Sequence, residues 1–112
     1  MGADPVACAA LAGGFRGKAF FVRKEAKAHG LARRVEGPLL TAQDRCVVVE
    51  DVVSTGSSTV KAIEALREEG REVVGVISVL DRLAGGAEVI TRAAGGAPYV
   101  ALTTIDDVYP ER

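Results

Sequence analysis

Four short apolar runs, rich in Val, Ile, Leu and Ala, constrain the fold of this chain most strongly. They read "AFFVR", "RCVVVEDV", "VVGVISVLD" and "YVALTTI" and occupy residues 19–23, 45–52, 73–81 and 99–105. Their hydrophobicity is nearly continuous rather than alternating, which is typical of strands buried on both faces of a parallel sheet. Only 4% of the residues are aromatic, against 48% that are hydrophobic, so small aliphatic side chains must build the core.

Helical patterns separate these strands. Between the second and third strand, Val60, Ile63 and Leu66 have the spacing of one helical face, and Gly70 stands where a helix is expected to stop. Residues 87–94 predict a second, shorter helix that ends at a pair of glycines. Strands that alternate with helices predict an α/β fold, with a parallel, twisted, doubly wound sheet flanked by helices.

The length of 112 residues suits one domain with a single modest core, so we assign residues 1–112 to one domain. Residues 4–13 predict an opening helix with a proline in its first turn. Residues 24–44 show neither the helical nor the strand period, and they include glycines and a proline. A loop of this length in a compact domain is usually functional, and we expect a mobile loop here.

Charge is unevenly distributed along the chain. The net charge of −1 argues against binding to bulk nucleic acid. Residues 16–34, however, contain seven Lys or Arg and one Glu, a local charge of +6 that leaves −7 for the rest. A basic segment on an acidic body indicates a localised anionic partner.

Several further classes of protein are disfavoured. No run of about 18 apolar residues is present, so we expect no membrane span. The N-terminus carries an acid and no basic leader, so we expect no signal peptide. Cys8 and Cys46 lack the spacing of metal ligands, which indicates two isolated thiols in a reducing cytosol and predicts a cytoplasmic protein.

The run "VVVEDVVSTGSS", residues 47–58, combines a strand end with a loop of small hydroxyl residues. Glu50 and Asp51 stand where ligands bind in parallel α/β sheets, at the carboxyl end of a strand. The loop then leads into a helix N-terminus, where backbone N–H groups and the helix dipole favour an anion. Gly56 allows the backbone to approach that anion. The run therefore predicts a cradle for a ribose phosphate, with acids for the sugar hydroxyls and the loop for the phosphate.

This run is compatible with other interpretations. It could be an ordinary turn followed by a Ser-capped helix. A P-loop requires a Gly-Lys-Ser/Thr sequence, and no lysine follows Gly56 at that place. A dinucleotide-binding fingerprint requires three spaced glycines, and this loop has one.

Two motifs of this sequence resemble those of a known family. "VVVEDVVSTGSS" resembles the phosphoribosyl-pyrophosphate (PRPP) signature of type I phosphoribosyltransferases, which implies their Rossmann-like core. "FFVRKEAKAHG", residues 20–30, resembles the mobile catalytic loop of the orotate phosphoribosyltransferases. The resemblance continues through "SVLDR" (78–82) to "YVALTTIDD" (99–107).

The resemblance implies a role for each matching residue. The catalytic residues would be Lys24, Lys27 and His29, which with Arg23 would contact the pyrophosphate of PRPP. The rest of PRPP would be bound by Glu50, Asp51, Val52, Val53, Ser54, Thr55, Gly56, Ser57 and Ser58, with Asp51 on the ribose hydroxyls. Orotate would be bound by Ser54, where the family commonly has Thr, and by Arg82. The guanidinium of Arg82 suits the orotate carboxylate, because the two groups pair bidentately.

The implied reaction transfers the ribose 5-phosphate of PRPP to orotate and gives orotidine 5′-phosphate and pyrophosphate, in pyrimidine biosynthesis. Mg²⁺ would be bound mainly by PRPP, pyrophosphate and water, with no metal site in the protein itself. The family is dimeric, with loop residues shared across the interface. Its members also carry an N-terminal hood over the base, which this sequence is expected to lack. Two alternatives stay open: transfer to another base, and a PRPP-binding module without catalysis.

Overall fold

The computed structural model describes residues 21–22, 35–36 and 44–111. Its main sheet has three strands, β3 (Arg45–Val53), β4 (Glu72–Asp81) and β5 (Tyr99–Thr104). They lie in the order β3-β4-β5 and both neighbouring pairs are parallel. All three carboxyl ends therefore meet at one edge of the sheet. The strands predicted at 45–52, 73–81 and 99–105 are thus confirmed.

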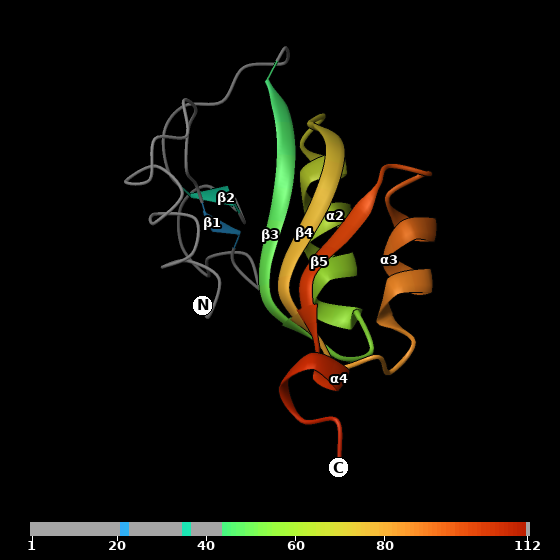
Figure 1. The fold of residues 1–112 in the computed structure, drawn as a ribbon. Coiled ribbons are helices and arrows are strands. Elements are labelled where there is room, and N and C mark those ends of the chain that lie inside the picture. Colours follow the sequence, from blue (N-terminus) through green and yellow to red (C-terminus); the bar gives the residue numbers. More distant parts are fainter. Residues whose placement is uncertain (1–20, 23–34, 37–43, 112) are drawn as a thin grey trace.

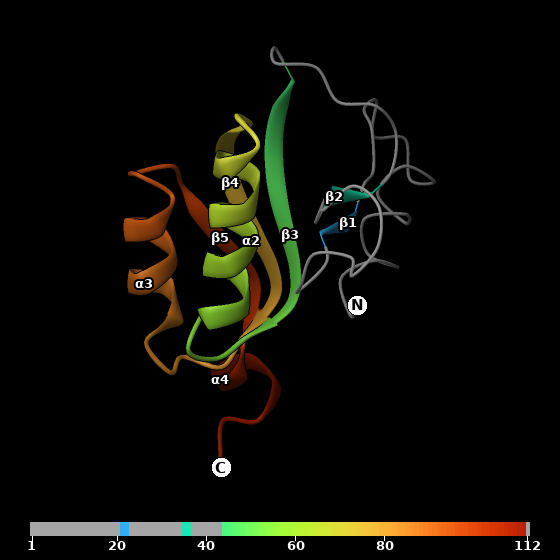
Figure 2. The same cartoon turned by 180° about the vertical axis from the view of Figure 1, so that it is seen from behind.

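Two helices connect these strands and cover one face of the sheet. Figure 1 and the reverse view in Figure 2 both place α2 (Ser57–Glu68) and α3 (Gly86–Ala93) on the same side. The two helices predicted from periodicity are confirmed. A short helix, α4 (Ile105–Val108), follows β5 at the carboxyl edge.

The core lies between the sheet and these two helices. Ile63 and Leu66 of α2 and Ile90 of α3 are at most 1% exposed. The buried apolar cluster consists of Cys46, Val48, Val53, Ile63, Leu66, Val73, Val76, Ile90 and Ala94. Small aliphatic side chains fill the space between sheet and helices, as the composition indicates.

The end of α2 shows how the sequence stops a helix. Gly70 has a φ of +75° and its N–H donates to the carbonyl oxygen of Arg67 over 2.9 Å. Glycine adopts this left-handed conformation without the steric cost that a β-carbon brings. The predicted helix stop at Gly70 is confirmed.

The first predicted strand is not part of the parallel sheet, and this part of the prediction is wrong. Its described residues form β1 (Phe21–Val22), which pairs antiparallel with β2 (Val35–Glu36). A run of apolar side chains does not specify its partner, and β2 is too short to leave a periodic signal. Residues 24–44, predicted as a loop without strands, thus contain β2. The rest of that loop up to residue 43, and the helix predicted at 4–13, lie outside the described residues.

The face of the sheet opposite α2 and α3 carries apolar side chains as well. Val47, Ile77, Val100 and Leu102 are between 37% and 69% exposed. Ile77 and Val100 are register partners in neighbouring strands, so these side chains lie side by side. Parallel sheets are usually covered on both faces. Among the described residues, helices cover only one.

Candidate functional site

An open pocket lies at the carboxyl edge of the sheet, where β3 runs into α2. Its volume is about 210 Å³. The pocket is lined by Val52, Val53, Ser54, Thr55, Gly56, Ser57, Ser58 and Thr59. Seven of these eight residues are predicted to bind PRPP, so the structure brings that part of the predicted site together around one hollow.

The start of α2 presents backbone N–H groups to this pocket. Gly56 is the N-cap, in the left-handed conformation with φ +85° and ψ 2°, and no side chain caps the helix. The helix begins with the Val60 N–H, which donates to the carbonyl oxygen of Gly56 over 2.9 Å. The N–H groups of the first turn have no acceptor inside a helix, and the helix dipole adds positive potential there. An anion in the pocket would accept hydrogen bonds from these N–H groups and would be attracted by the helix dipole.

The two acids at the end of β3 have different surroundings. Glu50 accepts a hydrogen bond from the Ser58 hydroxyl over 3.3 Å, which ties the strand end to the first turn of α2. Asp51 accepts one from the N–H of Val52 over 2.8 Å. The two carboxylates thus have different hydrogen-bond partners, one on α2 and one within β3. The carboxylates can therefore serve different parts of a sugar phosphate.

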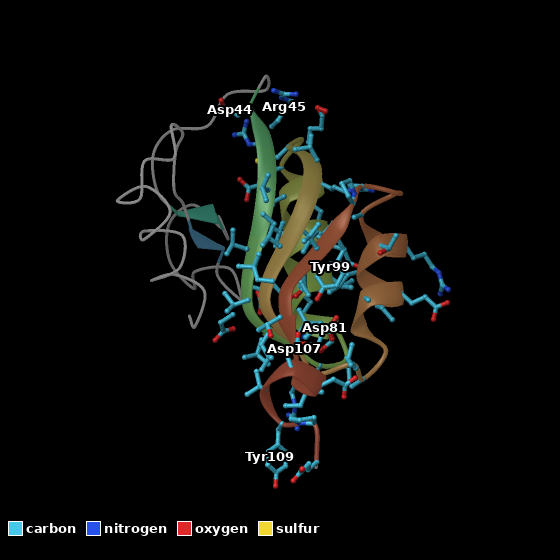
Figure 3. The ribbon with its side chains drawn as sticks, in the orientation of Figure 1. Asp44, Arg45, Asp81, Tyr99, Asp107 and Tyr109 are labelled. Carbon is cyan, nitrogen blue, oxygen red and sulfur yellow. The ribbon has the colours of Figure 1, made fainter. Side chains whose placement is uncertain are left out.

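A hydrogen-bonded network joins the start of β5 to the carboxyl-terminal part of β4 (Figure 3). The Tyr99 hydroxyl lies 2.9 Å from an oxygen of Asp81 and 2.7 Å from the Ser78 hydroxyl. Ser78 and Asp81 are at most 3% exposed. Burial, and next the hydrogen bond to the carboxylate of Asp81, raise the pKa of Tyr99, although the Ser78 hydrogen bond works in the opposite direction. Sequence reasoning missed this network; the signal for it was polar Ser78 within an apolar strand.

This network holds the turn that carries Arg82. Asp81 also accepts a hydrogen bond from the N–H of Leu83 over 2.8 Å, and Leu83 has a φ of +59°. The N–H of Arg82 donates to the carbonyl oxygen of Val53 over 2.8 Å. The backbone of Arg82 is thus bonded to the end of β3, while its side chain is exposed. Arg82, predicted to bind orotate, lies next to the start of the predicted phosphate loop.

The end of β5 is closed by a capping box. The backbone N–H of Thr104 and the hydroxyl of Thr103 donate to the same carboxylate oxygen of Asp107, each over 3.1 Å. These hydrogen bonds, the backbone one first, lower the pKa of Asp107. Thr104 and Asp107 together start α4. This carboxylate therefore stabilises a helix end.

Part of the predicted site cannot be placed. Arg23, Lys24, Lys27 and His29 lie outside the described residues. Within the parts of the chain that the structure describes, no three His, Cys, Asp or Glu residues gather as a metal site would require. Cys46 is buried, and this burial raises the pKa of its thiol. No helix in the described ranges is both long enough and apolar enough to cross a membrane.

Comparison with known protein families shows the family to which this chain belongs. The sequence model described as "Phosphoribosyl transferase domain" matches residues 7–96. The chain belongs to the phosphoribosyltransferase domain family. The α/β fold class expected from the sequence is confirmed, since solved phosphoribosyltransferase structures superimpose on it.

Individual relatives and solved structures are similar to this chain over most of its length. The chain is 53% identical over 109 residues to an orotate phosphoribosyltransferase of Corynebacterium glutamicum, covering 96% of this chain and 58% of the relative. It is 56% identical over 103 residues to that of Streptomyces avermitilis, with coverages of 88% and 56%. The Mycobacterium tuberculosis orotate phosphoribosyltransferase in complex with PRPP superimposes with a TM-score of 0.80 at 42% identity, covering 96% of this chain and 60% of that one.

These matches confirm the resemblance that the two motifs predicted. The first of these motifs, residues 47–58, lies wholly within the matched family domain. The chain spans slightly more than half the length of the curated relatives it matches.

Proposed function

We propose that this phosphoribosyltransferase domain acts as an orotate phosphoribosyltransferase, which transfers the ribose 5-phosphate of PRPP to orotate and releases pyrophosphate. The observation that carries this proposal is the pocket between β3 and α2, lined by the PRPP-like motif. The relatives that share about half of its residues are named for this activity. The product would be orotidine 5′-phosphate, an intermediate of pyrimidine biosynthesis.

The 5-phosphate would bind at the start of α2. The N–H groups of Ser57 and Ser58 belong to its first turn, and Ser54 and Thr55, which also line the pocket, would add hydroxyl donors. The site needs no lysine here, because main-chain N–H groups and the helix dipole supply the positive potential. Asp51 would accept hydrogen bonds from the ribose hydroxyls.

The pyrophosphate would lie toward the basic loop, where Arg23, Lys24, Lys27 and His29 would contact it. Pyrophosphate leaves the anomeric carbon as a ring nitrogen of orotate arrives, so negative charge accumulates on the leaving group. Cationic side chains that stabilise this charge lower the barrier, and a loop that closes over the site excludes water. Magnesium would enter as part of the PRPP complex and share the charge of its phosphate oxygens.

Orotate would be bound by Ser54 and Arg82. The hydrogen bond from the Arg82 N–H to Val53 fixes the Arg82 backbone beside the loop that binds the phosphate. A bidentate guanidinium–carboxylate pair would orient the ring nitrogen toward the sugar. Catalysis would thus depend on positioning and charge rather than on a strong nucleophile.

We also propose a cytoplasmic homodimer in which Lys27 and His29 reach the neighbouring subunit's site. Mixing the Lys27→Ala and Asp51→Asn variants tests this. Mixed dimers would have one site with an intact loop and an intact ribose cradle, so the mixture should recover about a quarter of wild-type activity. No recovery, in a mixture shown to exchange subunits, would contradict sharing of the loop.

The experiment that tests the activity follows pyrophosphate release from PRPP, magnesium and a base. Orotate should support turnover, whereas adenine, hypoxanthine and uracil should not. Release with a different base would support the alternative of another substrate. Binding of PRPP without release would support a binding module.

A further inference from the structure

The first residue of α3 lies against the loop that forms the pocket. A β-carbon on Gly86 would come within 2.6 Å of the carbonyl oxygen of Ser54 and within 2.6 Å of Cγ1 of Val53. It would also lie 3.1 Å from the backbone nitrogen of Gly56. Two of these atoms are main chain, and Val53 is 1% exposed, so none can swing aside as the end of a flexible side chain would.

The contact is reciprocal. A β-carbon on Gly56 would lie 3.1 Å from the carbonyl oxygen of Gly86 and 3.2 Å from its Cα. Among the described glycines, those with positive φ are Gly56, Gly70, Gly85, Gly95 and Gly96. Gly86 is not one of them, so its conformation alone does not require glycine. The close approach of α3 to the loop is what excludes a side chain there.

The connection from β4 to α3 is therefore attached to the pocket loop at both ends. At one end the N–H of Arg82 donates to the carbonyl oxygen of Val53 over 2.8 Å. At the other end Gly86 packs on the backbone of Ser54 and Gly56. A displacement of α3 relative to the sheet would move the loop with it, because packed backbones do not deform independently.

We propose that Gly86 is a positioning residue for the 5-phosphate of PRPP. It lets α3 support the loop of residues 54–56 from outside the pocket, at the place where the first-turn N–H groups of α2 can reach the phosphate. This inference rests on the proposed function and adds a residue that does not itself line the pocket. An added methyl group at Gly86 would displace the Ser54 carbonyl and Gly56, which both belong to the pocket lining.

The test compares three variants of the 112-residue chain. Gly86→Ala introduces the methyl group. Gly75→Ala is the matched control, because a β-carbon there would meet only the Pro98 carbonyl oxygen, at an ordinary 3.6 Å. Val73→Ala removes a buried side chain from the amino-terminal end of β4, so it lowers stability at a distance from the loop.

Isothermal titration with two ligands separates positioning from general destabilisation. Ribose 5-phosphate carries the group that the loop would bind, whereas magnesium pyrophosphate would bind the basic loop. Gly86→Ala should weaken ribose 5-phosphate by about tenfold or more and leave pyrophosphate within about twofold, since displacement of about 1 Å suffices to disrupt a phosphate site. Both control variants should bind both ligands as the wild type does.

Unchanged affinity of Gly86→Ala for ribose 5-phosphate would overturn this inference. Equal losses of affinity for ribose 5-phosphate and pyrophosphate would overturn it too, as would an equal loss of ribose 5-phosphate affinity in Val73→Ala. If Gly86→Ala does not fold, the Val53→Ala/Gly86→Ala double variant removes one of the two 2.6 Å contacts and is compared with Val53→Ala. A wild-type chain that binds neither ligand would overturn the proposed function, and this inference with it.

Discussion

Tyr99, at the start of β5, donates its hydroxyl hydrogen to Asp81, at the end of β4, over 2.9 Å. Because a phenol has one hydrogen, the 2.7 Å contact between Tyr99 and Ser78 must use the Ser78 hydroxyl as donor. The resulting chain runs from Ser78 through Tyr99 to a buried carboxylate. That carboxylate also holds the N–H of Leu83, so the network sets the start of the turn that carries Arg82.

Tyr99→Phe should therefore destabilise the fold by about 1–3 kcal/mol, because it removes the hydrogen-bond partner of buried Ser78 and the donor to one carboxylate oxygen of Asp81. Urea unfolding at pH 7 measures the change. Tyr109→Phe, at a tyrosine that is 58% exposed, is the control and should change stability by less than about 0.5 kcal/mol. Equal effects of the two substitutions would show that the network does not contribute.

Wild type and Tyr99→Phe should also differ in how their stability changes at alkaline pH. The pKa of Tyr99 is raised above its ordinary value of 10.0, so the unfolded chain releases this proton at a lower pH than the folded chain does. The contribution of the neutral phenol is complete below pH 10 and falls as the pH rises through the folded pKa. The stability difference between wild type and Tyr99→Phe should thus shrink above pH 10. A difference that stays constant up to the folded pKa would contradict this.

Gly56 and Gly70 provide a matched test of the loop. Both have positive φ, but a β-carbon on Gly56 would meet the backbone of Gly86 at 3.1 Å, whereas nothing lies within 4 Å of one on Gly70. Gly70→Ala should cost about 1–2 kcal/mol from its conformation alone. Gly56→Ala should cost more and should also weaken PRPP binding, as calorimetry would show. If Gly70→Ala weakened PRPP binding equally, the loop would have no special part in it.

Asp51→Asn should weaken PRPP by about tenfold or more, because it removes the charge that accepts hydrogen bonds from the ribose hydroxyls. Glu64→Gln, an exposed acid on α2, is the control for loss of one negative charge. Direct titration of PRPP compares the two variants. Undiminished affinity in Asp51→Asn would remove this residue from the ribose site.

Lys27→Ala should lower turnover strongly and leave PRPP affinity within a few-fold, because its charge matters most as pyrophosphate departs. Lys61→Ala, at an exposed lysine on α2, removes the same charge at a residue that is not part of the predicted site and should leave turnover unchanged. Steady-state kinetics with orotate and PRPP measures both. An otherwise active protein whose turnover does not respond to Lys27→Ala would contradict the loop assignment.

The sequence predicted the elements whose signal is local. Continuous apolar runs located β3, β4 and β5, and helical spacing with a closing glycine located α2 and its end at Gly70. The pairing of Phe21–Val22 with Val35–Glu36 was missed, because antiparallel partners are chosen by tertiary contacts that a short apolar run does not encode.

The candidate site, like the fold, was predicted only where its signal is local in the sequence. A ribose-phosphate cradle was predicted at residues 50–58, because a loop, a glycine and a helix start are consecutive in the sequence, and the structure has a pocket at residues 52–59. The contact of Gly86 with Ser54 was not predicted, since it depends on how closely α3 approaches a loop some thirty residues earlier. Tyr99 packs on the core and its hydroxyl joins Ser78 to Asp81, contacts between strands that local sequence patterns do not encode.

One measurement tests the central claim most directly: calorimetric titration of magnesium PRPP into the chain, followed by orotate and an assay of released pyrophosphate. Saturable PRPP binding followed by orotate-dependent release is the predicted result. If PRPP does not bind at concentrations that saturate an intact phosphoribosyltransferase, the pocket between β3 and α2 is not a PRPP site, and the proposed activity is wrong.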